Sequence, residues 1–187
     1  FTIEVNDDLN GLKNKLVINA DPFRIDIFSG NDWVIEGNQR EMFNFEVYRT
    51  RKKNKDCIDS CWEERFKEYT DTKPHGPMSV GMDFSFIDFE HLFGIPSHAD
   101  SFSLKNTKGG SDPYRLYNVD VFEYELYNPM SLYGAYPLMV AHSTAPKTVG
   151  LFWNNPSETW IDIESSKKNR LTHWFSETGV IDVFFLL

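Results

Sequence analysis

The chain has 187 residues and a formal net charge of −9 at pH 7, with 41% hydrophobic and 16% aromatic residues. This length suits one domain with a buried core, and the apolar content excludes a disordered chain. The negative charge argues against nucleic acid as a partner, because phosphate backbones attract Lys and Arg. No apolar stretch reaches the roughly 20 residues of a membrane-spanning helix, so no membrane contact is expected either.

Short runs typical of strands dominate the first part of the chain. An alternating segment covers residues 1–5, and the runs 23–28 and 33–35 flank a group of turn-forming residues, which predicts a hairpin. The chain closes on the strongly apolar segment 180–187. Terminal residues are usually exposed and loosely held, so we expect both ends to be cuts from a longer protein.

Residues 49–73 interrupt this pattern with a charged segment, which we interpret as an insertion. Aromatic residues recur at steps of four and three between Cys61 and Tyr69, a pattern that predicts one short amphipathic helix. Cys57 and Cys61 are spaced to close a small disulfide loop in an oxidising compartment or to remain two thiols, and we favour the disulfide. No second pair of ligands at matching spacing supports a zinc site.

Strand-like runs resume after the insertion. They cover residues 79–86, 91–94, 101–105, 115–124, 138–141, 148–153, 160–163, 174–175 and 180–187. Many short strands with turn residues between them indicate an antiparallel β-sandwich. We therefore predict a mainly β protein, with one sandwich domain over residues 1–187 and a short helix in the inserted loop.

Reactive groups give little sign of catalysis by this chain. The five histidines share no ligand spacing, so neither a metal nor another cofactor is expected. No serine or cysteine lies in a nucleophile motif. Glu123 and Glu125 would share one face of a strand, either as a glycosidase-like pair or, the better interpretation, as the polar edge of a sheet. Arg115 is expected to pair with an acid on a neighbouring strand.

Aromatic residues crowd the region from Tyr114 to Tyr136. Sugars stack on aromatic faces and hydrogen-bond to nearby acids and amides, as other small ligands use apolar walls with a few polar anchors. An aromatic-rich sandwich core explains several of these side chains equally well. The residues alone thus indicate a β-sandwich that is either carbohydrate-facing or simply rich in core aromatics.

Four stretches together resemble the amino-terminal domain of glycoside hydrolase family 31: GIPSHAD, PYRLYNVDVFEYE, PMSLYGAYP and GLFWNNPSETWIDI. Weaker agreement extends over nearly the whole chain, and the combination is highly specific. The resemblance implies a galactose-mutarotase-like β-sandwich that precedes a (β/α)8 catalytic barrel. Because the family's two catalytic aspartates lie in the barrel, it also implies no catalytic residue in this chain and no activity of this chain alone.

The resemblance further implies a parent α-glucosidase that removes α1,3-linked glucose from N-glycans in the lumen of the endoplasmic reticulum. Its implied partners are the catalytic barrel of the same polypeptide, the glucosylated N-glycan and a regulatory β subunit. One alternative is a stand-alone carbohydrate-binding module. Another, the weakest, is a mutarotase-like enzyme, which would require a histidine and an acid paired in the sandwich cleft.

In this family a loop just ahead of an LYG motif helps to form the sugar pocket. The matching candidates here are Asn128, Pro129, Met130, Tyr133 and Gly134. Relatives often carry an aspartate ahead of the motif, and this chain does not, so that contact is not carried over. The Asn128 amide could bond to sugar hydroxyls, Pro129 would stiffen the loop, and Gly134 would permit an unusual backbone angle. The alternative is that Asn128–Pro129 starts a turn and Tyr133 packs at a domain interface.

Overall fold

The computed structural model describes residues 1–6, 11, 13–51, 61–62, 65–70, 75 and 78–187. Every regular element in that part of the chain is a β-strand. The strands are β1 (Thr2–Asn6), β2 (Lys13–Ala20), β3 (Phe23–Ser29), β4 (Asp32–Gly37), β5 (Asn44–Phe45), β6 (Thr50–Arg51), β7 (Cys61–Trp62), β8 (Arg65–Phe66), β9 (Tyr69–Thr70), β10 (Val80–Ile87), β11 (His91–Gly94), β12 (Tyr114–Leu116), β13 (Leu138–Ser143), β14 (Lys147–Trp153), β15 (Thr159–Ser165), β16 (Asn169–Ser176) and β17 (Val183–Leu186).

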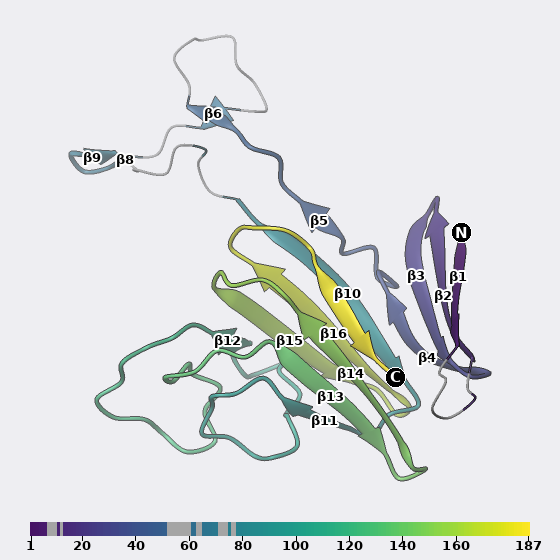
Figure 1. Ribbon diagram of the computed structural model, residues 1–187. Helices are drawn as coiled ribbons and strands as arrows, with labels where there is room; N and C mark the ends of the chain where they lie inside the picture. Colours follow the sequence, from purple (N-terminus) through teal and green to yellow (C-terminus); the bar gives the residue numbers. More distant parts are fainter. Residues whose placement is uncertain (7–10, 12, 52–60, 63–64, 71–74, 76–77) are drawn as a thin grey trace.

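Two antiparallel sheets form the body of the molecule (Figure 1). The larger sheet has the strand order β1-β2-β3-β4-β10-β16-β15-β12, and β5 pairs with β10 beside it. The smaller sheet has the order β11-β13-β14-β17. The predicted antiparallel β-sandwich is therefore confirmed.

The core lies between the two sheets. Strand β15 alternates between buried and more exposed residues, as expected when one face of a sheet packs and the other meets water. Trp153 of β14 and Trp174 of β16 are fully buried, and their ring centroids lie 6.1 Å apart. The buried indole Nε1 of Trp153 donates a hydrogen bond to the Ser176 hydroxyl at 2.8 Å, so this core aromatic leaves no polar atom unpaired.

Strand β10 is buried on both faces. The face that points away from the smaller sheet is polar and carries Asp83 and Ser85. The fully buried Asp83 accepts hydrogen bonds from the backbone amides of Arg40 (3.0 Å) and Met42 (3.2 Å). The segment that follows β4 thus covers this face of the sheet. Nearby, burial raises the pKa of the Glu36 carboxyl, and the Arg24 guanidinium opposes the rise in part.

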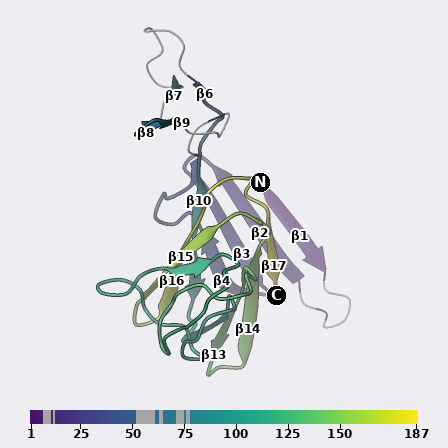
Figure 2. The same cartoon turned by 90° about the vertical axis from the view of Figure 1, so that its left-hand side faces the viewer.

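Strands β6 to β9 stand away from the sandwich, as both ribbon views show (Figure 2). The short helix expected between Cys61 and Tyr69 is wrong for the residues described there. Instead, β8 and β9 pair as a hairpin with a two-residue turn. Lys67 in this turn has a φ of 56°, an angle that a right-handed helix does not contain. The expected disulfide lies outside the described residues, because Cys57 and the side chain of Cys61 are not among them.

Two further expected strands are loops. Residues 101–105 form no strand, and of the extended segment expected over 115–124 only Arg115 and Leu116 pair in a sheet, as part of β12. The remainder, from residue 117 to 137, is a long loop at one end of the sandwich. Glu123 and Glu125 are both exposed in this loop, so the predicted shared face of a strand is wrong for them.

Candidate functional site

The candidate loop is held in place by backbone hydrogen bonds to two other segments. Tyr127 donates its amide to the carbonyl of Ala99 at 2.6 Å, and Asn128 forms an isolated β-bridge with the same residue. The amide of Val119 donates to the carbonyl of Leu132 at 2.8 Å, which ties the two ends of the loop together. The loop therefore has a defined conformation although it contains no long strand.

The side chain of Asn128 is used within the loop itself. Its Oδ1 accepts a hydrogen bond from the amide of Met130 at 3.0 Å, which is the geometry of an Asx turn. Its Nδ2 donates to the exposed carboxylate of Glu125 at the longer distance of 3.3 Å. The Asn–Pro turn is thus present, and the second bond is the one that a ligand would exchange most readily.

Three of the five predicted site residues lie together around a hollow of about 250 Å³. Asn128, Pro129 and Met130 form one wall, and Arg115 and Trp160 contribute to the other. The hollow therefore joins the loop to the edge of the larger sheet, where β12 pairs with β15.

The other two predicted residues do not line this hollow. The hydroxyl of Tyr133 donates to the carbonyl of Val121 at 2.7 Å, so Tyr133 connects two parts of the loop that covers residues 117–137. Gly134 has no left-handed backbone angle, contrary to the expected reason for a glycine. The reason is space, because a Cβ on Gly134 would lie 2.8 Å from the Ser97 hydroxyl and 2.9 Å from the Tyr136 ring.

Arg115 is a residue whose full role the sequence did not reveal. Its expected acidic partner is Glu158, with 2.6 Å between Nε and Oε1. Its guanidinium also lies 4.9 Å from the ring centroid of Tyr117 and 5.2 Å from that of Trp160. The planar group is thus held by one carboxylate and two aromatic faces, an arrangement that lysine would not reproduce.

The backbone carbonyl of Arg115 connects two more segments to the same point. It accepts hydrogen bonds from Nε2 of His98 at 2.9 Å and from the hydroxyl of Ser131 at 3.0 Å. Because a carbonyl only accepts, Nε2 of His98 must carry the proton. Burial lowers the pKa of His98, and the bond to Arg115 opposes that shift, so the neutral ring is the favoured form.

A buried polar network supports the loop from behind. The hydroxyl of Tyr114 donates to Asp100 at 2.8 Å and accepts from the amide of Lys105 at 2.9 Å. Burial alone would raise the pKa of Asp100, but hydrogen bonds from Lys105, Ser101 and Tyr114 lower it overall. The Nζ of Lys105 pairs with Asp100 and donates to the carbonyl of Tyr127 at 2.9 Å, which carries the network into the loop.

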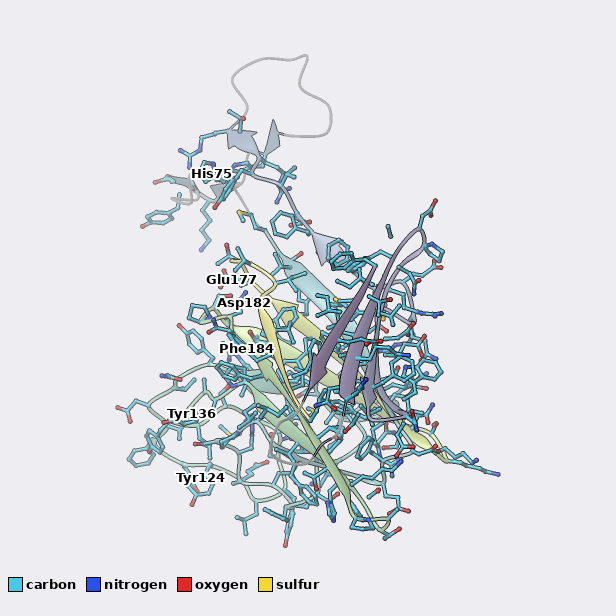
Figure 3. All side chains as sticks on the ribbon, turned by 45° about the vertical axis from the view of Figure 1, so that its right-hand side comes forward. His75, Tyr124, Tyr136, Glu177, Asp182 and Phe184 are labelled. Atoms are coloured by element: carbon cyan, nitrogen blue, oxygen red, sulfur yellow. The ribbon has the colours of Figure 1, made fainter. Side chains whose placement is uncertain are left out.

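A larger hollow of about 730 Å³ lies on the other side of the Arg115–Glu158 pair. Its walls include the aromatic side chains of Tyr117, Tyr136 and Phe152. Its polar lining includes Asn118, Asn154, Glu158 and Glu177. Figure 3 shows Tyr136 and Glu177 on the same side of the molecule. Sequence patterns do not reveal this hollow, because its lining comes from four separate segments of the chain.

Two kinds of site are not found in the described part of the chain. It contains no group of three or more His, Cys, Asp or Glu residues that could hold a metal ion. Among the same residues, no helix is long and apolar enough to span a lipid bilayer.

The sandwich and its loop-built end define the class of this protein before any comparison. They are those of an antiparallel β-sandwich domain whose connecting loops form two hollows at one end. Residues 3–162 match the model of the glycosyl hydrolase 31 N-terminal galactose mutarotase-like domain. The chain therefore belongs to glycoside hydrolase family 31 and corresponds to the amino-terminal domain of its members.

Three known proteins illustrate the similarity. Neutral alpha-glucosidase AB of Sus scrofa is 39% identical over an alignment that covers 92% of this chain and 23% of that protein. The crystal structure of a glucosidase II alpha subunit in its alpha3-Glc2-bound form is 40% identical, with a TM-score of 0.81 over 100% of this chain and 23% of that one. The catalytic subunit in an ER glucosidase II heterodimeric complex, solved with the binding domain of its regulatory subunit, is 42% identical. Its TM-score is 0.82, over 100% of this chain and 22% of that one. This chain thus spans less than a quarter of the length of these relatives.

Proposed function

We propose that residues 1–187 are the non-catalytic domain of an α-glucosidase that removes α1,3-linked glucose from N-glycans. In this proposal the domain braces the catalytic barrel of the same polypeptide and lends the loop around Asn128 to its sugar pocket. The observation that carries the proposal is the similarity over the whole chain to glucosidase II alpha subunits, one of them in an alpha3-Glc2-bound form. The names of these relatives also favour the lumen of the endoplasmic reticulum and a regulatory subunit as a further partner.

The loop geometry supports a contact with sugar. Asn128, Pro129 and Met130 border an open hollow, and the amide of Asn128 has a long bond to an exposed acid that sugar hydroxyls could replace. The backbone of the loop is already fixed by hydrogen bonds to Ala99 and Val119, so little conformational entropy would be lost on binding.

The apolar surface of the sandwich supports the bracing role. An open hollow of about 460 Å³ is lined almost entirely by apolar side chains, among them Phe43, Phe45 and Phe185. Phe43 and Phe45 of this lining are each about half exposed. Clustered apolar side chains that remain open to water are typical of surfaces that another domain covers.

A stand-alone carbohydrate-binding module remains the alternative from the sequence, but no observation favours it. The proteins matched are α-glucosidases rather than isolated binding modules.

The test compares this chain with the complete polypeptide that contains it, using a disaccharide of two α1,3-linked glucose units as substrate. We expect the complete polypeptide to hydrolyse the disaccharide and residues 1–187 alone to hydrolyse none. Asn128→Ala in the complete polypeptide should lower kcat/KM about tenfold, the loss of one good hydrogen bond to the substrate.

Asn31→Ala is the matched control, because Asn31 is an exposed asparagine in the hairpin turn between β3 and β4. Hydrolysis by residues 1–187 alone would contradict the non-catalytic assignment. Equal kinetics for Asn128→Ala and Asn31→Ala would show that Asn128 does not contact the substrate and only forms the turn.

A further inference from the structure

The hollow of about 730 Å³ has the size and lining of a ligand site rather than of a gap between loops. Its volume falls within the roughly 300–1,000 Å³ that is usual for small-ligand pockets. Tyr117 and Tyr136 expose 47% and 63% of their surface beside it, so much of both rings is open to a ligand. We call it the Tyr136 hollow.

The base of the Tyr136 hollow is rigid. Asn155 is buried, and its Nδ2 donates to the carbonyls of Thr178 (2.8 Å) and Val180 (3.1 Å). The amide of Glu177 donates to the carbonyl of Glu158 at 2.9 Å, which places these two acidic residues on adjoining segments. A site built on such fixed segments needs little reorganisation to bind a ligand.

The polar groups of the hollow select a neutral ligand with hydroxyl groups. Of the residues that the structure describes, those in the lining include two carboxylates and no Lys, Arg or His: Glu158, which is paired with Arg115 outside the lining, and Glu177. Carboxylates only accept hydrogen bonds, and an excess of acids over cations disfavours phosphates and other anions. The side chain of Asn118 is exposed and has no hydrogen-bond partner among the described residues, so it is available as both donor and acceptor. Aromatic walls with carboxylates and amides suit a sugar ring, which offers an apolar face and a rim of hydroxyls.

The Tyr136 hollow adjoins the hollow at the Asn128 loop. Arg115 lines the hollow at the Asn128 loop, and its ion-pair partner Glu158 lines the Tyr136 hollow. The two hollows thus share one wall, and Tyr136 lies two residues after Gly134. A longer oligosaccharide that enters one hollow could therefore extend into the other.

We propose that the Tyr136 hollow binds a second sugar residue of the oligosaccharide, remote from the glucose that is removed. This inference rests on the proposed function, because it takes the same glycan as ligand. Tyr136 and Asn118 then act as specificity-determining residues, which favour long glycans over small glucosides.

The experiment uses the complete polypeptide and two substrates, a small aryl α-glucoside and a trisaccharide of one glucose and two mannoses. Tyr136→Ala and Asn118→Ala should raise KM for the trisaccharide about tenfold, the effect of losing one well-placed contact, and leave KM for the aryl glucoside unchanged. Tyr124→Ala is the matched control, because Tyr124 is 52% exposed on the same side of the molecule but lines neither hollow (Figure 3). Tyr136→Phe should keep most of the affinity, because the ring remains.

Two outcomes would overturn the inference. One is unchanged kinetics on both substrates. The other is an equal change on both substrates with a lower melting temperature, which would show that another domain packs into the hollow. A binding measurement with the trisaccharide by calorimetry keeps this test separate from the proposed function. If the complete polypeptide binds the trisaccharide through Tyr136 but hydrolyses nothing, the proposed function is contradicted, whereas the inference that the Tyr136 hollow binds sugar is supported.

Discussion

Arg115 and Glu158 form an ion pair of 2.6 Å that separates two hollows at one end of the sandwich. Arg115 comes from β12, and Glu158 directly precedes β15, the strand that pairs with β12. The guanidinium is also stacked beside Tyr117 and Trp160. This one contact therefore joins the edge of the larger sheet to the loop that carries the candidate site.

Arg115→Lys should destabilise the protein by about 1 kcal/mol, because a lysine keeps the charge but loses the planar contacts with two rings. Arg115→Ala should cost about twice as much, since Glu158 would then lose its partner as well. Chemical denaturation of the variants measures both values. Lys108→Ala serves as a control, because its ion pair with Glu164 is exposed and such pairs contribute little. Equal stability of Arg115→Lys and the unmutated protein would show that the stacking contributes nothing.

Gly94→Ala and Gly134→Ala should differ strongly in their effect on stability. At Gly94, φ is +106° and an added Cβ would overlap the carbonyl oxygen of Leu138, which is backbone and cannot move aside. We expect a loss of about 3 kcal/mol there, from backbone strain and a steric clash together.

At Gly134 the added Cβ would meet only the side chains of Ser97 and Tyr136, which can rotate. A loss of about 1 kcal/mol is expected. Thermal unfolding of the two variants provides the comparison. A larger loss at Gly134 than at Gly94 would mean that the loop is more tightly packed than its contacts indicate.

Glu36→Gln should stabilise the protein at neutral pH and have little effect in acid. Glu36 is 3% exposed, one of its carboxylate oxygens has no hydrogen-bond partner among the described residues, and burial raises its pKa. A group whose pKa is raised on folding contributes stability below its unfolded value of about 4.3 and loses that contribution as pH rises through the folded value. Glutamine does not ionise, so the variant avoids this loss.

Melting temperatures of Glu36→Gln and the unmutated protein between pH 4 and pH 8 test this sign. The melting temperature of Glu36→Gln should be higher than that of the unmutated protein at pH 7.5, and this difference should shrink toward zero near pH 4. Glu123→Gln is the control, because Glu123 is exposed in the long loop. A variant that is less stable than the unmutated protein at pH 7.5, with a deficit that shrinks toward pH 4, would show instead that the pair with Arg24 stabilises the fold.

Local pattern predicted most of the long strands. The alternating residues 23–28 appear as β3, because a strand that packs one face against a core tends to alternate in sequence. The apolar run 148–153 appears as β14, which has three consecutive buried residues. The same reasoning failed for residues 115–124, which alternate equally well but find a partner strand only at Arg115 and Leu116. Alternation reports that a segment suits a sheet, whereas pairing requires a neighbour with free backbone groups.

The sequence by itself determined that this chain is a β-sandwich of glycoside hydrolase family 31, and it pointed to the loop around Asn128. Only the tertiary structure decided that Asn128 bonds within its own turn, that Arg115 and Glu158 meet, and that Tyr117 and Tyr136 border one hollow with Glu177. The physical reason is distance along the chain. Periodicity and turn chemistry act over a few neighbouring residues, while the hollows are built from segments that are brought together by strand pairing and core packing.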